Sequence, residues 1–416
     1  MLACRVAITR KLKLRTGRSI WQSRRCPRVP QLPLTRDIRC DAAIIGAGIS
    51  GALIAEALTD AGLQVVVLDR RGALKGSTTA TTALVQYELD TPLIKLSEMV
   101  GREKAERIWR RSRLAVDALR ERSRILSIKA DVTNRDSLYL SGDVLSHAAL
   151  QREGVARRRV GFNATFFDKR EVYERFGVKG RSALLSYDNF AADPRRLAAG
   201  FLLAAVARGA RIYSPVEVSE VSATRNGVAA STKSGRRVRC RHLVFATGYE
   251  MLKVIPAKNH KVFSTWAIAT RPQPRSIWPT GCFIWEAARP YLYMRVSPDN
   301  RIICGGEDEE FLDEERRDAL LDRKKKALER KLKALFPQVD SRAEFAWCGS
   351  FGTSTTGMPT IGAVPKLPNC YVAMGYGGNG ITFSMMAAQM LGGLITKAGD
   401  SDADLVSVSP RAGAVR

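Results

Sequence analysis

Three glycines near the start of the chain have the spacing of a phosphate-binding turn. Gly46, Gly48 and Gly51 follow a short apolar run and precede a helical pattern rich in alanine and leucine. In such a turn the first glycine permits the tight bend, the second lets the backbone approach a pyrophosphate, and the third lets helix and strand pack closely. The N-terminus of the helix offers free N–H groups and partial positive charge to the same anion. This pattern predicts a dinucleotide site.

An acidic residue completes the pattern. A second apolar run, Val65–Leu68, ends at Asp69, which lies 18 residues after Gly51. An acid near this distance hydrogen-bonds the ribose hydroxyls in βαβ dinucleotide-binding units. A glycine-rich turn without a ligand is the alternative, and the combination of strand, glycines, helix, second strand and acid argues against it.

Three further segments have residues suited to lie against a polar ligand. The segment 76–79 is Gly-Ser-Thr-Thr, which favours a loop and helix start whose hydroxyls face phosphate or a ring edge. An apolar run over 243–246 predicts a buried parallel strand that ends at Thr247 and Gly248, at the sheet edge where cofactors sit. The glycine-rich segment 375–384 lies between a strand and a helix, where backbone N–H groups could hold the electron-rich edge of a flavin.

The elements that must position these residues are predicted from periodicity. Helices are expected over 92–127, where apolar residues recur at three- and four-residue spacing. Strand-like segments at 263–270, 290–296 and 301–306 indicate an antiparallel sheet outside the cofactor domain. The range 307–335 is predicted to be one helix, because its acids cluster at the start and its lysines at the end, which complements the helix dipole.

The chain as a whole is long and basic. Its 416 residues allow two domains or one large α/β unit with an inserted second region. The 67 Lys and Arg residues exceed the 41 Asp and Glu residues, giving a net charge of +26. That charge would suit nucleic acid or an anionic membrane, but the arginines are spread out without interleaved aromatic residues, so no nucleic-acid partner is predicted. No apolar run of about 18 residues is present, so no transmembrane segment is predicted.

Cysteine and histidine usage predicts no metal site. The eight cysteines are scattered and there are only three histidines, so the chain is typical of a reduced, cytoplasmic protein. Residues 1–38 lack the apolar core of a secretory signal, and their prolines interrupt an amphipathic helix. A tryptophan at position 21 is unusual in a solvated extension. Either this extension folds back onto the body or it is a flexible tail.

Taken in order, these segments resemble the D-amino-acid oxidase superfamily, which includes glycine oxidase, sarcosine oxidase and γ-glutamylputrescine oxidoreductase. The resemblance covers about residues 40–396. It implies one non-covalent FAD in extended conformation, an antiparallel sheet over the flavin, and hydride transfer from the substrate carbon to flavin N5. The implied cofactor-binding residues are Gly46, Gly48, Ile49, Ser50, Gly51, Asp69, Arg70, Ser77, Thr78, Thr79, Val216, Ala246, Thr247, Gly248, Gly378, Asn379, Gly380, Ile381 and Thr382.

The implied fold class is α/β (α+β overall), with a Rossmann-type FAD-binding domain that is discontinuous in sequence and an antiparallel-sheet substrate domain. The FAD-binding domain is expected to comprise residues 39–90, 191–255 and 345–398, and the substrate or cap domain residues 91–190 and 256–344. A basic N-terminal extension (1–38) and a flexible tail (399–416) are expected at the two ends.

One segment departs from the glycine oxidase-like pattern. Those proteins carry an arginine that binds the substrate carboxylate, and this sequence has Phe351 at the corresponding position. Where those proteins usually have an aspartate, this sequence has Thr356. A phenyl ring cannot make the bidentate contact of a guanidinium. Either another arginine, with Arg295 the candidate, holds the carboxylate, or the substrate is an amine that lacks one. Tyr291 and Tyr293 share one face of a strand and are expected to line the substrate cavity, with ordinary sheet packing as the alternative.

The resemblance implies an FAD-dependent oxidoreductase that oxidises a C–N bond of a small amine or amino acid. Two alternatives stay open: oxidation of a 2-hydroxy acid or polyol, and a flavoprotein subunit of a larger complex. The electron acceptor could be oxygen, a quinone or a protein, and no side chain stands out as a catalytic base. Cys348 falls one residue from the place where sarcosine oxidase attaches its flavin, so a non-covalent FAD is expected.

Overall fold

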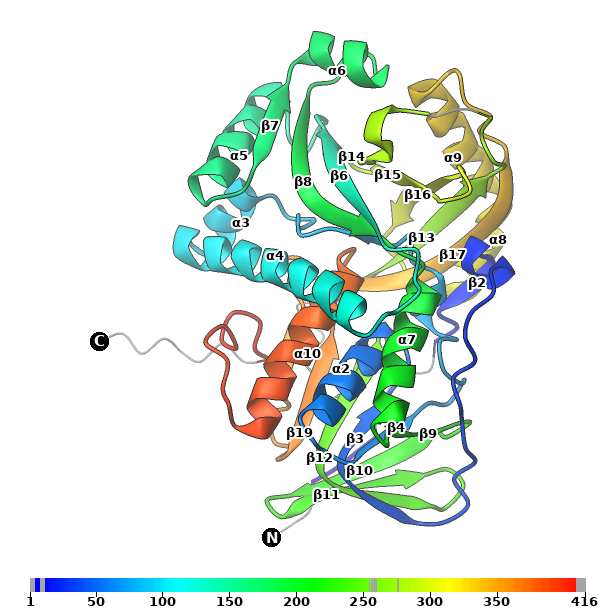
Figure 1. Cartoon of the computed structure of the whole chain (residues 1–416), viewed down its shortest axis with the longest axis vertical. Coiled ribbons are helices and arrows are strands. Elements are labelled where there is room, and N and C mark those ends of the chain that lie inside the picture. Colours follow the sequence, from blue (N-terminus) through cyan, green and yellow to red (C-terminus); the bar gives the residue numbers. More distant parts are fainter. Residues whose placement is uncertain (1–3, 8–11, 254, 256–259, 275–276, 409–416) are drawn as a thin grey trace.

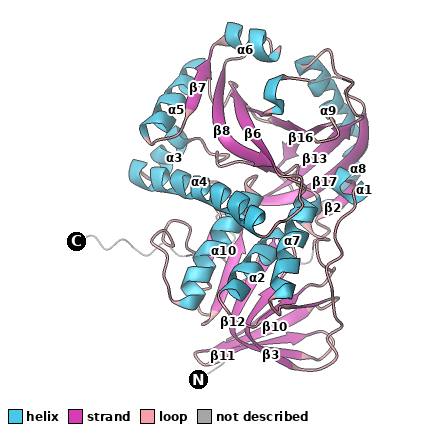
Figure 2. Ribbon diagram, in the orientation of Figure 1, coloured by secondary structure: helices cyan, strands magenta, loops and turns pink. Residues whose placement is uncertain are grey.

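Two large β-sheets, placed toward opposite ends of the long axis, organise the chain (Figure 1). The computed structural model describes residues 4–7, 12–253, 255, 260–274 and 277–408. Among these residues, no helix is both long and apolar enough to cross a membrane. The helices lie against the sheets and between them (Figure 2).

The first sheet has nine strands and a parallel centre. Strands β3, β4, β9, β12 and β19 run parallel to their neighbours in the centre, and all four residues of β4 are buried, as expected for a parallel strand covered on both faces. Helices α2 (Ile49–Asp60), α7 (Pro194–Ala207) and α10 (Gly380–Thr396) lie together on one face (Figure 1). The strands are β1 (Cys4–Ala7), β3 (Ile38–Ile45), β4 (Val65–Leu68), β9 (Arg211–Tyr213), β10 (Val218–Thr224), β11 (Gly227–Thr232), β12 (Arg237–Gly248), β18 (Thr360–Ala363) and β19 (Cys370–Met374).

The second sheet has ten strands and is mostly antiparallel. Helix α9 (Leu321–Leu335) covers one face, where Leu328 and Leu332 join the same buried cluster as Ile268 and Ile302. The strands are β2 (Arg15–Arg18), β5 (Leu84–Val85), β6 (Thr133–Leu140), β7 (Ala164–Phe167), β8 (Ala183–Ala191), β13 (His260–Thr270), β14 (Phe283–Glu286), β15 (Leu292–Val296), β16 (Ile302–Glu309) and β17 (Ala343–Ser354). The remaining α-helices are α1 (Ile20–Ser23), α3 (Leu93–Val100), α4 (Arg102–Ile125), α5 (His147–Arg159), α6 (Lys169–Phe176) and α8 (Glu314–Ala319).

The predicted helix over 307–335 is wrong at its start. Strand β16 continues to Glu309, which pairs with Ser264 of β13, and the helical residues begin only at Glu314. The carboxylate of Asp313 caps that helix by accepting the N–H of Arg316 at 2.9 Å. Pairing with a neighbouring strand therefore overrides the local charge order, and the acids at 307–309 belong to the sheet.

The N-terminal extension folds back onto the body. Strand β2 pairs antiparallel with β17, and α1 follows it. The side chain of Trp21 is 0% exposed, and its indole N–H donates to the carbonyl of Thr81 at 2.7 Å. Burial of the indole against the hydroxyl-rich segment explains why a tryptophan occurs in this basic extension. We call residues 12–25 the N-terminal strap. Residues 1–3 and 8–11 of the extension lie outside the described residues.

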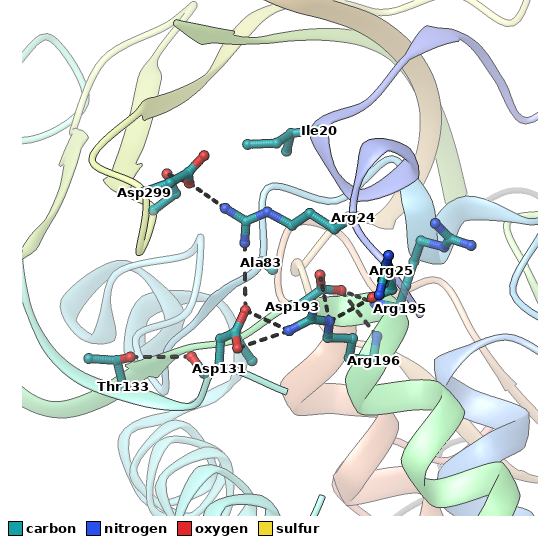
Figure 3. Close-up of polar contacts among 12 residues, drawn as sticks. Ile20, Arg24, Arg25, Ala83, Asp131, Thr133, Asp193, Arg195, Arg196 and Asp299 are labelled. Carbon is teal, nitrogen blue, oxygen red and sulfur yellow. Dashed lines mark hydrogen bonds and ion pairs between the residues drawn. The ribbon is translucent and has the colours of Figure 1, made fainter. Parts of the chain in front are cut away.

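Charged groups fasten the end of the strap. The guanidinium of Arg24 pairs with Asp299 and lies 3.7 Å from Asp131, which also accepts a hydrogen bond from Arg196 at 3.0 Å (Figure 3). Arg196 also donates from Nε to the carbonyl of Arg25 at 2.8 Å. These contacts join the strap to α7 and to the loop before β16.

The C-terminal segment differs from the flexible tail that the sequence predicts. Leu405 and Val406 are buried, and the carbonyl of Val406 accepts the N–H of Ile361 at 2.9 Å. The carboxylate of Asp400 pairs with Arg111 of α4 at 2.8 Å. Two apolar side chains and an acid opposite an arginine-rich helix hold this segment in place. Residues 409–416 lie outside the described residues.

Candidate active site

A cavity of about 400 Å³ connects the glycine turn of the first sheet with residues of the second sheet. Most of the predicted cofactor residues line it: Gly46, Gly48, Ile49, Ser50, Asp69, Arg70, Ser77, Thr78, Val216, Ala246, Thr247, Gly248, Gly378, Asn379, Gly380 and Ile381. Tyr291, Tyr293 and Phe351 line it as well, at the end formed by the second sheet.

The glycine turn leaves no room for side chains. Gly46 has a φ of +116°, and a Cβ there would lie 2.3 Å from the carbonyl oxygen of Ala246. A Cβ at Gly51 would lie 1.8 Å from the carbonyl oxygen of Gly46, so this glycine shapes the turn without lining the cavity. Helix α2 starts at Ile49, and the N–H groups of its first turn have no carbonyl partner within the helix. The turn therefore presents donors to an anion.

Asp69 fixes the backbone around this turn. Its carboxylate accepts the N–H groups of Ala47 at 2.8 Å, Arg71 at 2.7 Å and Gly72 at 2.9 Å. The side chain also lines the cavity. Three N–H donors hold the carboxylate in one orientation beside the nucleotide end, as expected for an acid that meets ribose hydroxyls.

A buried carboxylate links the nucleotide end to the N-terminal strap. Glu250 pairs with Arg70 and Arg71, and it accepts the N–H of Leu12 at 3.0 Å. Arg71 also donates to the carbonyl of Leu12 at 2.6 Å. Leu14 of the strap lines the cavity itself. The strap therefore forms part of the cavity wall, which the sequence analysis did not predict.

The hydroxyl-rich segment contacts the start of α2. Thr78 accepts the N–H of Ile49 at 3.0 Å through its hydroxyl oxygen. Thr79 instead donates to the carbonyl of Gly76 at 3.1 Å and does not line the cavity. The Ser77 hydroxyl is buried at the cavity wall without a hydrogen-bond partner. It is therefore placed to bond a ligand.

The loop before α10 forms the other end of the cavity. The N–H of Gly378 donates to the carboxylate of Asp90 at 2.8 Å, and the hydroxyl of Tyr249 donates to the carbonyl of Gly377 at 3.0 Å. Thr382 donates to the carbonyl of Gln86 at 2.8 Å and, like Gly51, supports the wall from behind. The segment around Gln86 and the α10 loop thus form one rigid wall.

Aromatic rings surround the cavity beyond this loop. The ring centroids of Tyr291 and Tyr293 are 5.2 Å apart, and Phe351 lies 6.5 Å from Tyr249. Trp285 of β14 also lines this end. We call the space among these five rings the aromatic chamber.

Arg295 does not line the cavity, which contradicts the expectation that it binds a substrate carboxylate. Its guanidinium is buried and donates to the carbonyl oxygens of Ala83 at 2.6 Å and Ala192 at 2.9 Å. Trp21 of the strap covers it, with 5.4 Å from the guanidinium to a ring centroid. Desolvation, followed by the nearby arginines, lowers the pKa of Arg295 to about 9. The prediction for Arg295 considered only its own strand. Trp21 of the strap, which covers the guanidinium, explains why Arg295 does not reach the cavity.

Two partly buried acids near the chamber were not predicted from the sequence. Burial raises the pKa of Asp90, partly offset by the N–H of Gly378. Burial raises the pKa of Asp308 to about 7, and the charge of Asp90 adds to the effect while the Thr265 hydroxyl opposes it. Asp90 follows the hydroxyl-rich segment closely in the sequence, and this proximity is the signal from which its place at the cavity could have been predicted. Asp308 was hidden inside the incorrectly predicted helix.

Cys348 lies away from the cavity. Its side chain is buried against Asp318, with 3.4 Å between Sγ and Oδ1, on the opposite side of β17 from Trp347. Among the described residues that line the cavity, none is a cysteine. This arrangement supports a non-covalent cofactor.

The cavity fits FAD. Ser77 and Gln86 line it, and each has a buried side-chain oxygen without a hydrogen-bond partner. A phosphate, ribityl hydroxyls and a flavin ring carry the donors and acceptors that such atoms require. Asp69 would hold the adenosine ribose, the glycine turn the pyrophosphate, and the α10 loop the flavin.

Comparison with known proteins agrees with this geometry. A γ-glutamylputrescine oxidoreductase from Escherichia coli (strain K12) is 25% identical over 374 residues, which cover 87% of this chain and 85% of that protein. A probable oxidoreductase, OrdL, from Haemophilus influenzae is 22% identical over 377 residues, covering 86% and 83%. The crystal structure of glycine oxidase from Geobacillus kaustophilus superposes with a TM-score of 0.72 at 19% identity, covering 90% of this chain and all of that one.

The model of a protein family described as FAD dependent oxidoreductase, DAO, matches residues 41–394, which is most of the chain. This match includes the glycine turn, strands β13 to β17 of the second sheet and most of α10. The chain therefore belongs to the DAO family of FAD-dependent oxidoreductases.

Proposed function

We propose that the protein oxidises a C–N bond of a small amine or amino acid. The observation that carries the proposal is the aromatic chamber with the carboxyl group of Asp90 on the cavity wall. Rings and carboxyl groups favour a positively charged ligand. A 2-hydroxy acid has no cationic group to meet the rings and Asp90, whereas an amine or amino acid has one, so the chamber disfavours that alternative. The name of the Escherichia coli relative, which refers to an amine, supports the same direction.

The residues of the chain have three tasks in this reaction. The chamber rings orient the substrate carbon, the rigid α10 loop fixes the far wall, and both exclude water. Asp90, whose pKa is raised by burial, can hold the proton that an ammonium must lose before its carbon is oxidised. FAD, when bound, supplies the ring that accepts the hydride. The partial positive charge at the N-terminus of α10 lies at the same end of the cavity.

The experiment is anaerobic bleaching of the purified yellow protein with panels of amines, amino acids, 2-hydroxy acids and polyols. We expect bleaching by an amine or amino acid and release of the flavin into the supernatant on acid precipitation. Bleaching only by hydroxy compounds would overturn the proposal. Bleaching by no compound, together with salt-sensitive capture of a protein partner, would instead favour a flavoprotein subunit of a larger complex.

A further inference from the structure

The N-terminal part of the chain pairs with the edges of both sheets. Strand β1 is the outermost strand of the first sheet and pairs with β10, and β2 is the outermost strand of the second sheet and pairs with β17. Between these two strands in the sequence, Leu14 of the N-terminal strap lines the cavity. The strap therefore adjoins the space in which FAD fits.

Leu14 lies where walls from both sheets meet. A Cβ on Gly76, in the hydroxyl-rich segment, would lie 3.9 Å from Cδ1 of Leu14, and a Cβ on Gly349 of β17 would lie 3.4 Å from the carbonyl oxygen of Leu14. That carbonyl accepts the N–H of Ser350 at 3.1 Å. Gly76, Gly349 and Ser350 all line the cavity as well. Leu14 therefore belongs to the surface that a bound FAD meets.

The backbone of Leu12 is held by charged groups of the cavity wall. Its N–H donates to the carboxylate of Glu250 at 3.0 Å, and its carbonyl accepts from the guanidinium of Arg71 at 2.6 Å. Arg71 and Glu250 form an ion pair with each other, and both line the cavity. A ligand at the nucleotide end and the strap thus meet the same two side chains, so whichever orders these side chains favours the binding of the other.

The two ends of the strap differ in how firmly they are held. The indole of Trp21 is fully buried and donates to the carbonyl of Thr81 at 2.7 Å. Strand β2 ends in two exposed residues, Gly17 and Arg18, and among the described residues it pairs only with β17. An edge strand can separate from its one neighbour without breaking other pairings, while Trp21 keeps the rest of the strap in place. We call residues 12–18 the flap.

We propose that the flap is a further element of the FAD site, which closes over the bound cofactor and must separate from β17 before FAD enters or leaves. Contacts that FAD makes only with the closed flap shift the equilibrium toward the closed state. Leu14 supplies an apolar contact, and Leu12 reaches the cofactor through Arg71 and Glu250. This inference concerns FAD alone and holds whichever substrate the protein oxidises.

The strand register offers a way to lock the flap. Thr16 lies opposite Cys348 in the pairing of β2 with β17, and both side chains contact Asp318, at 2.8 Å from the Thr16 hydroxyl and 3.4 Å from Sγ of Cys348. Neither Thr16 nor Cys348 is among the residues that line the cavity. Directly opposed strand residues whose side chains share one face have the spacing that a disulfide requires. Thr16→Cys should therefore form a bond to Cys348 without touching FAD.

The lock is tested by comparing one variant in two redox states. FAD-loaded Thr16→Cys is oxidised with glutathione disulfide or kept reduced, mass spectrometry identifies the bond, and the fluorescence of free flavin after dilution gives the rate of FAD release. We expect release from the oxidised protein to be at least about tenfold slower than from the reduced protein, because the locked flap cannot separate. Wild type treated in the same two ways should keep one rate. Equal rates for the bonded and the reduced variant would overturn the proposal.

Thr16→Pro tests the opposite direction and does not depend on a disulfide. Proline has no N–H for the strand ladder, so this variant weakens the pairing of β2 with β17. We expect FAD release to be about tenfold faster than in wild type. Thr165→Pro is the matched control, because β7 is also an edge strand of the second sheet, pairs with β8 and does not line the cavity. A wild-type release rate for Thr16→Pro contradicts the proposal.

Hydrogen exchange distinguishes a flap that closes on FAD from a strand that only stabilises the fold. In wild type, the amides of residues 12–18 should exchange at least about threefold more slowly in the FAD-loaded protein than in the FAD-free protein, because FAD and the closed flap stabilise each other. The amides of β7 serve as the internal control and should exchange alike in both forms. Equal exchange of residues 12–18 in the two forms would assign the strap to fold stability alone.

Discussion

The side chain of Phe351 lines the aromatic chamber. Its ring stacks on Phe263 at a centroid distance of 5.5 Å and contacts the cavity, so a longer cationic side chain there would enter the chamber. We expect Phe351→Arg to weaken binding of cationic amines by about tenfold and to strengthen binding of small carboxylates by a similar factor. Titration of the bound flavin with an amine and with acetate checks both effects. Phe351→Leu, which removes the ring without adding charge, is the control and should not gain carboxylate affinity.

Gly51 is the residue where the cofactor turn tolerates least change. A Cβ there would lie 1.8 Å from the carbonyl oxygen of Gly46, so Gly51→Ala must displace the turn that receives the pyrophosphate. We expect this variant to purify nearly free of flavin, which the ratio of visible to ultraviolet absorbance measures. Gly392→Ala in α10 has open space around it and should keep its flavin, with a helix as stable or more stable. A yellow Gly51→Ala protein would show that the turn is more adaptable than its geometry implies.

At the scale of elements, the packing of the N-terminal strap against the body contributes to the free energy of unfolding. Trp21 is fully buried, bonds Thr81 and covers the guanidinium of Arg295. We expect Trp21→Ala to lower the free energy of unfolding by about 3–5 kcal/mol, since it leaves a cavity and uncovers a buried charge. Chemical denaturation of the FAD-loaded protein measures the change. Leu32→Ala removes an exposed side chain and should have little effect.

The sequence predicted the elements whose signals are local. Several elements appear where the pattern places them: strand β3, the glycine turn, helix α2, strand β12, which ends at Gly248, and helix α10, which starts within the glycine-rich segment 375–384. It could not predict contacts made across hundreds of residues. Arg295 looked available because nothing local shows that Trp21 covers it, and Asp308 looked helical because its pairing strand lies about forty residues away. Charge order and periodicity report on a segment, whereas a cavity wall is assembled from many segments.

At the scale of the whole molecule, acids with shifted pKa values contribute to how stability responds to pH. The pKa of Asp308 rises in the folded protein from its ordinary value near 4 to about 7. Between these values the folded state binds a proton that the unfolded state has released, so stability decreases as pH rises through this window and is constant above it. Asp318 acts oppositely: its ion pairs lower its pKa to about 2, so its contribution is lost below pH 4.

Denaturation of ligand-free wild type and of Asp308→Asn at pH 5 and pH 8 tests this dependence. The difference in unfolding free energy between the two pH values should be smaller for the variant, which cannot ionise. Asp90 and Glu307 add negative charge near Asp308, and Lys324 opposes it. Glu310→Gln serves as the comparison, because the Glu310 side chain is exposed and pairs with Lys261 instead. Identical pH slopes for wild type and Asp308→Asn would show that this carboxyl is ionised in the folded protein.

Strand β2 also has a consequence for how the protein is made. Residues 15–18 leave the ribosome first among the described strands of the second sheet, yet their partners, 346–349, are synthesised more than three hundred residues later. A contact of such sequence separation forms late, because it closes a loop of more than three hundred residues. During synthesis, β2 therefore has no partner strand until β17 has been made, although the contacts of Trp21 with Thr81 and Arg295 can form earlier. Nascent chains stalled before residue 343 should be cleaved by added protease at residues 15–18, and release of the full chain should protect them.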